Sequence, residues 1–156
     1  MSDLYPLLRL AHILSASVLF GSGAAIAFFM LMAWRSGDRA GFALTARHVV
    51  LADWLFTATA VAVQPLSGVA LAHAAGWPLD APWLVASYAL YLFIGACWLP
   101  VVWIQYRVKR LLAAASGKDI PEPARRLMRI WFALGWPAFA ALIAIFVLMI
   151  AKPEFP

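Results

Sequence analysis

One stretch decides the fold: residues 4–34 read LYPLLRLAHILSASVLFGSGAAIAFFMLMAW. This run is almost wholly apolar, and about 20 apolar residues are enough to cross the hydrocarbon core of a bilayer. It therefore predicts a membrane-spanning α-helix. One imidazole, that of His12, lies inside the run. Because an ionisable side chain is costly in hydrocarbon, His12 is a candidate functional residue by default.

The composition extends this prediction to the whole chain. Of the 156 residues, 65% are hydrophobic and 12% are charged, and the mean hydropathy is +0.87. Soluble domains are about 45–50% apolar and about 25% charged, so this chain has too little polar surface to coat a soluble globule. We expect one integral membrane domain over residues 1–156, with the lipid bilayer as its solvent. The single cysteine, Cys97, excludes an intrachain disulfide.

Four apolar runs predict an all-α membrane protein, a bundle of four transmembrane helices at about residues 4–34, 49–72, 83–106 and 130–151. A cleaved signal peptide is the alternative for the first run, but no basic segment precedes it and the run is too long. Pro65 predicts a kink in the second span. Gly21 and Gly23 predict that the first helix packs closely on a neighbour.

The basic residues predict the orientation of the bundle. Three of the twelve Lys and Arg lie between spans one and two, seven lie between spans three and four, and none lies between spans two and three. Short cytoplasmic loops collect Lys and Arg, so both termini are expected outside. Topology and anionic lipid headgroups account for the charge, so nucleic-acid binding is not expected. Asp53 is expected near the cytoplasmic face, paired with Arg47 or Arg129.

Several polar residues share the depth of His12 when each span is counted inward at about 1.5 Å per residue. They are Ser15, Gln64, Ser67, Tyr88 and Tyr91. Such a layer either surrounds a ligand or redox cofactor, or bonds the helices to one another, and spacing alone leaves both open. His48 and His73 are expected at the two membrane surfaces. The chain contains no phosphate loop, HExxH motif or nucleophile elbow.

Short motifs along the chain carry a family resemblance. The segment LLRLAHIL at residues 7–14 resembles the opening of a small bacterial membrane family, domain of unknown function 2269. It is also similar to the first helix of HemJ-type protoporphyrinogen oxidases and of CopD-type copper-resistance proteins. Further similarities are QPLSG at 64–68, PWL at 82–84, and a last helix with Pro137 followed by Lys152 and Pro153.

The HemJ resemblance implies a multi-pass protein of the bacterial inner membrane that binds b-type haem and acts in redox chemistry as a haem-dependent oxidoreductase. His12 would be the axial ligand and Arg9 would pair with a propionate. The polar residues at the depth of His12 would complete the cofactor site: Ser15, Gln64, Ser67, Tyr88 and Tyr91. In this chain Gly135-Trp136 stands where the HemJ-type last helix has Asn-Glu, so the resemblance implies haem binding more directly than oxidase activity.

The CopD resemblance implies the alternative, a non-enzymatic membrane subunit or a copper-handling protein. Copper sites usually need several His, Met or Cys ligands, and only His73 and Met149 are available to help His12. A quinone or porphyrin is the small-molecule partner expected of the redox protein. Association with further copies of the chain is expected as well.

Overall fold

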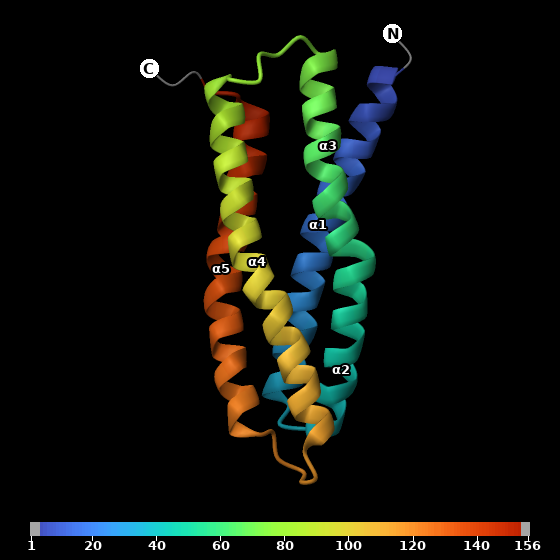
Figure 1. Cartoon of the computed structure of the whole chain (residues 1–156), viewed down its shortest axis with the longest axis vertical. Coiled ribbons are helices and arrows are strands. Elements are labelled where there is room, and N and C mark those ends of the chain that lie inside the picture. Colours follow the sequence, from blue (N-terminus) through green and yellow to red (C-terminus); the bar gives the residue numbers. More distant parts are fainter. Residues whose placement is uncertain (1–3, 154–156) are drawn as a thin grey trace.

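The computed structural model describes residues 4–153, which are helical throughout apart from short connections (Figure 1). The elements in chain order are α1 (Leu4–Arg35), α2 (Arg39–Ala52), the π-helix η1 (Asp53–Ala58), α3 (Thr59–Ala74), α4 (Pro82–Ala114) and α5 (Glu122–Ala151). Together α2, η1 and α3 form one continuous span, so four helical segments are long and apolar enough to cross a membrane. The predicted all-α architecture with four spans is confirmed.

The helices extend beyond the predicted spans at the end of the bundle that holds the basic loops. The second span begins at Arg39 rather than near residue 49, α4 continues to Ala114, and α5 begins at Glu122. The prediction followed the apolar runs, whereas a helix continues past the hydrocarbon where long basic side chains reach the polar surface. The long basic segment 107–129 is therefore mostly helix, and its true connection is short.

A helix cap explains the early start of the second span. The carboxylate of Asp38 accepts hydrogen bonds from the backbone N–H groups of Ala40 and Gly41, both at 3.0 Å, and so satisfies N–H groups that the first turn leaves free. Arg39 then donates to the backbone carbonyls of Leu112 and Gly117, at 2.9 and 2.5 Å. These bonds tie the start of α2 to the end of α4 and to the connection that follows it.

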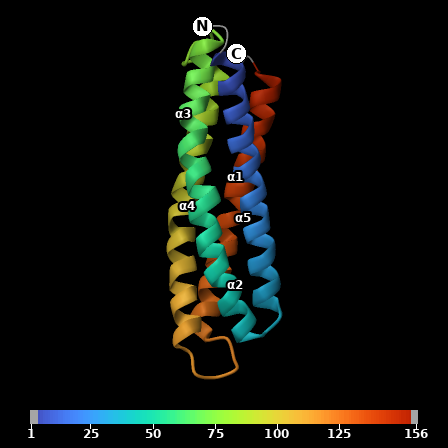
Figure 2. The ribbon, with the colours of Figure 1, turned by 90° about the vertical axis from the view of Figure 1, so that its right-hand side faces the viewer.

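The bundle consists of two packed pairs that join most tightly at the basic end. Figures 1 and 2 show α1 beside the second span and α5 beside α4, and the closest packing follows the same pairs. Across the pairs, α2 packs on α4. The main core lies there, with one fully buried side chain from each span: Met30, Phe42, Val108 and Met128.

The π-helix η1 lies in the middle of the second span. A π-helical turn bonds each residue to the fifth one along, and such turns occur frequently at functional sites. It buries the side chains of Asp53 and Thr57, while Trp54, Leu55 and Phe56 are exposed on the lipid-facing side. The hydroxyl groups of Thr57 and Ser22 lie 3.0 Å apart and link η1 to α1. The π-helical turn is at η1, and Pro65, where a kink is predicted, lies within α3.

Candidate functional site

Four of the predicted polar residues form one hydrogen-bonded cluster between α1 and α3. The Nδ1 atom of His12 lies 3.1 Å from the Ser67 hydroxyl oxygen, and its Nε2 atom lies 3.3 Å from the Gln64 amide nitrogen. The Ser15 hydroxyl donates to the Gln64 amide oxygen, and the Ser67 hydroxyl lies 2.7 Å from the carbonyl oxygen of Val63. The cluster confirms that these residues share one depth.

A single protonation pattern satisfies the whole cluster. If the neutral imidazole carries its proton on Nδ1, it donates to Ser67, and Nε2 accepts from the Gln64 amide group. Both ring nitrogens of His12 are then engaged. The arrangement joins α1 to α3 without leaving an unpaired nitrogen in the membrane.

Gly68 allows the His12 ring to lie against α3. A Cβ atom added at Gly68 would stand 3.0 Å from His12 Cε1, so a larger residue would displace the ring. Gly21 and Gly23 behave differently, since a Cβ atom at either position meets nothing within 4 Å. The expectation that these two glycines mark a close helix contact was therefore wrong, because the small-residue pattern does not say which face of α1 meets a neighbour.

The remaining candidates lie outside the His12 cluster. Arg9 is exposed on α1, and His48 and His73 are exposed on the second span. The Tyr88 hydroxyl is buried without a partner among residues 4–153; its side chain packs against the small core of Ala72, Ala81, Trp83 and Leu84. Depth counting placed Tyr88 and Tyr91 level with His12, but it could not give the direction in which each side chain points.

Tyr91 instead repairs a defect that Pro65 creates. Proline has no backbone N–H, so the carbonyl four residues earlier, that of Val61, loses its helical partner. The Tyr91 hydroxyl donates to that Val61 carbonyl oxygen at 2.5 Å. The bond crosses from α4 to α3 and satisfies a backbone group that no water can reach in hydrocarbon.

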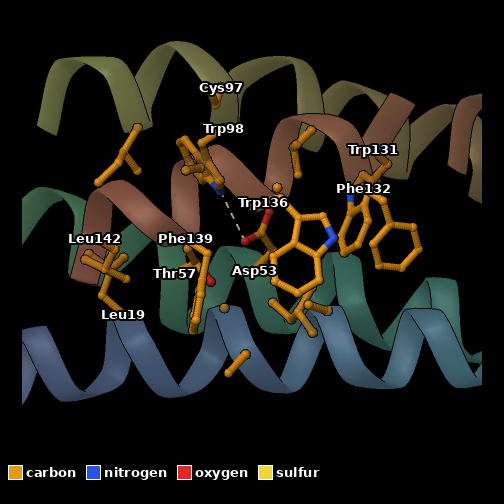
Figure 3. A pocket seen from close by; sticks show the side chains of 18 of the residues that line it. Leu19, Asp53, Thr57, Cys97, Trp98, Trp131, Phe132, Trp136, Phe139 and Leu142 are labelled. Atoms are coloured by element: carbon orange, nitrogen blue, oxygen red, sulfur yellow. Dashed lines mark hydrogen bonds between the residues drawn. The ribbon is translucent and has the colours of Figure 1, made fainter. Parts of the chain in front are cut away.

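A cavity of about 420 Å³ lies between α1, η1, α4 and α5 (Figure 3). Its walls are almost entirely apolar and rich in aromatic rings, namely Phe28, Tyr91, Trp98, Trp131, Phe132, Trp136 and Phe139. Three glycines on the walls, Gly23, Gly95 and Gly135, have open space where a side chain would stand. The cavity falls within the range of about 300–1,000 Å³ that small-molecule sites occupy. His12 does not line it.

The cavity wall carries one carboxyl side chain, that of Asp53, the first residue of η1. Its side chain is 4% exposed. One carboxyl oxygen accepts from the Trp98 indole N–H at 3.3 Å, drawn as the dashed line in Figure 3. The other, Oδ2, is buried and has no partner within the described part of the chain. A second cavity of about 260 Å³, lined in part by Trp54 and Trp103, also borders Asp53 and Trp98.

The expected pairing of Asp53 with Arg47 or Arg129 was therefore wrong. The second span starts ten residues earlier than predicted, so Asp53 lies well inside the bundle rather than near the basic end. The sequence did contain a signal, because the rule that singled out His12 as an intramembrane ionisable residue applies equally to Asp53.

Two further polar side chains on the cavity wall were not predicted from the sequence. The amide oxygen of Gln105 on α4 and the indole N–H of Trp131 on α5 are buried, and neither has a hydrogen-bond partner within residues 4–153. Gln105 is 2% exposed and Trp131 is 4% exposed. A glutamine within an apolar helix is a weak sequence signal, and a tryptophan there gives none.

Residues 4–153 contain no group of three or more His, Cys, Asp or Glu side chains placed to hold a metal ion. Cys97 is buried as a free thiol.

These features define an integral membrane protein with four helical spans and an aromatic-lined cavity between them. The chain belongs to the family described as "Predicted integral membrane protein (DUF2269)", whose model matches residues 6–153. No curated protein and no solved structure matches the chain.

We predict that Tyr91→Phe lowers the free energy of unfolding by about 1 kcal/mol, because it leaves the Val61 carbonyl unpaired. In a Pro65→Ala background the helix supplies its own N–H to Val61, so the same Tyr91→Phe change should cost markedly less. The free energy of unfolding by dodecyl sulfate in bicelles is measured for wild-type protein, the two single variants and the double variant, which completes a double-mutant cycle. Equal costs in the two backgrounds would show that the Tyr91 hydroxyl does not compensate for Pro65.

Proposed function

We propose that this chain binds a lipid-soluble, ring-bearing small molecule of the quinone or porphyrin class in the central cavity, within the membrane. The observation that carries the proposal is the cavity of about 420 Å³ with aromatic walls. Flat rings gain from offset or edge-to-face contact with aromatic side chains, and a small number of polar groups orients a ligand in an otherwise apolar site.

The position of the cavity supports a ligand that arrives through the lipid. Trp136 lines the cavity and is also 73% exposed, so this side chain stands at an opening of the site. It lies on α5, among exposed apolar residues suited to acyl chains. A molecule dissolved in the bilayer reaches such an opening directly, whereas a water-soluble substrate would have to cross hydrocarbon.

Redox chemistry and location belong to the same proposal. Quinones and porphyrins take part in electron transfer, and the HemJ resemblance in the sequence supports a redox role.

The asymmetry of the basic loops supports a bacterial inner-membrane protein with its basic end in the cytoplasm and both termini outside. Self-association stays a prediction, as does the alternative role of a non-enzymatic membrane subunit.

Haem b with His12 as axial ligand fits the described residues poorly. An axial imidazole needs one free nitrogen, and both nitrogens of His12 are hydrogen-bonded to α3. The ring also lies against Gly68, and His12 does not face the central cavity. The haem hypothesis therefore requires α1 and α3 to separate at this cluster.

An absorption spectrum decides between His12 as a haem ligand and His12 as a link between helices. We expect that protein supplied with haemin shows no Soret band that depends on His12, because both ring nitrogens of His12 are hydrogen-bonded, one to Ser67 and the other to Gln64. His48→Ala is the control, since His48 is exposed and far along the span. A Soret band that His12→Ala abolishes and His48→Ala preserves would restore the haem hypothesis.

Filling the cavity tests the proposed function itself. Gly135→Leu places a side chain in the cavity, where a Cβ atom meets no neighbour within 4 Å. Duroquinone, a fully methylated benzoquinone, should bind saturably to wild-type protein in lipid nanodiscs and quench the fluorescence of the tryptophans on the wall. Gly135→Leu should weaken binding at least about tenfold, which corresponds to about 1.4 kcal/mol.

Gly21→Leu is the matched control for this experiment. Gly21 is exposed on α1, lies outside the cavity and also has open space for a side chain, so its substitution should leave binding unchanged. Empty nanodiscs correct for probe dissolved in lipid. Saturable binding that survives Gly135→Leu, or no saturable binding at all, would contradict the proposed site.

A further inference from the structure

Three of the four residues that carry a buried side-chain atom without a hydrogen-bond partner in residues 4–153 line the central cavity. The atoms are Asp53 Oδ2, Gln105 Oε1 and Trp131 Nε1, whereas the fourth, the Tyr88 hydroxyl, lies elsewhere. The three come from η1, α4 and α5 respectively. Residues with unpaired atoms on three elements thus share the wall of one cavity.

These unpaired atoms are costly, so their shared location requires an explanation. A buried polar atom without a partner costs about 1–3 kcal/mol. Elsewhere in the bundle the Tyr88 hydroxyl is unpaired as well, but other buried polar groups have partners, as in the His12 cluster and the Tyr91–Val61 bond. A ligand that supplies the missing partners accounts for the polar atoms on the cavity wall, since a bound molecule would remove this cost.

The chemistry of the three atoms specifies the ligand. Asp53 Oδ2 and Gln105 Oε1 are oxygen atoms that accept hydrogen bonds, and Trp131 Nε1–H donates one. A quinone carbonyl can only accept, so it offers nothing to the Gln105 oxygen. A hydroxyl group both donates and accepts, and it can therefore bond the carboxyl group of Asp53 in either protonation state.

We propose that the cavity prefers the hydroxyl-bearing, quinol-like form of a lipid-soluble ring over its carbonyl-bearing form, with Asp53 and Gln105 as the residues that determine this preference. The inference rests on the proposed function, because it concerns the ligand of the same cavity. The Trp98 indole donates to the other carboxyl oxygen of Asp53, and Oδ2 has no hydrogen-bond partner by geometry within residues 4–153. Trp131 is left to donate to a hydroxyl oxygen.

Three probes of one ring system test the preference: duroquinol, its dimethyl ether and duroquinone. The ether and the quinone both lack a donor, and the quinone is no larger than the quinol. Under anaerobic, reducing conditions for the quinol, wild-type protein in nanodiscs should bind duroquinol at least about tenfold more tightly than either of the others. Equilibrium dialysis with empty nanodiscs subtracted measures the three affinities.

Two substitutions should remove the preference. Asp53→Asn can retain the bond from Trp98 while turning an N–H donor toward the position of Oδ2, and Gln105→Leu removes the acceptor oxygen. In each variant the affinities for duroquinol and duroquinone should lie within about threefold of each other. Tyr88→Phe is the control, because it removes an unpaired buried hydroxyl outside the cavity, and it should keep the full preference. Should one cavity variant fail to fold, the other carries the test.

The outcomes separate the two proposals. If Gly135→Leu blocks all three probes but wild-type protein binds them equally, the cavity is a ring-binding site and the donor preference is refuted. The same conclusion follows if Asp53→Asn and Gln105→Leu both keep the preference for duroquinol. If Gly135→Leu blocks none of the probes, the proposed function fails as well.

Discussion

A polar group inside a lipid bilayer has no water to bond, so each one must find its partner within the protein. This constraint explains most of the specific contacts in the bundle. Pro65 leaves the Val61 carbonyl free, and Tyr91 satisfies it from the neighbouring span. His12 engages both of its nitrogens with α3. Where pairing is complete, the polar residues act as links that set the relative positions of the helices.

The same constraint makes the central cavity exceptional. The two helix pairs pack tightly at the basic end, where the fully buried side chains of all four spans meet. Nearer the middle of the bundle the π-helix turns Asp53 inward, and glycines on α1, α4 and α5 leave space opposite it. Asp53, Gln105 and Trp131, which carry unpaired buried atoms, all line this cavity. The site is therefore described as much by its unsatisfied hydrogen bonds as by its volume.

The sequence predicted the spans and part of the polar layer for clear physical reasons. Apolar runs report the length of the hydrocarbon crossing, and the constant rise of a helix places His12, Gln64 and Ser67 at one depth. Depth counting gives no rotation about the helix axis, so it could not separate Ser67, which faces His12, from Tyr88, which does not. The helix ends were missed because charged turns remain helical outside the hydrocarbon, and that error moved Asp53 toward the membrane surface. The π-helix leaves no pattern in the residues that form it.

The most direct test of a ligand-binding cavity is to identify what the protein carries from its own membrane. Wild-type protein and the cavity-filled Gly135→Leu variant would be purified side by side in a mild detergent and extracted with organic solvent for mass spectrometry. The account predicts that an aromatic, lipid-soluble molecule with a ring hydroxyl is recovered in near-stoichiometric amount from wild-type protein and is depleted from the variant. Recovery of phospholipid alone from both proteins would contradict it.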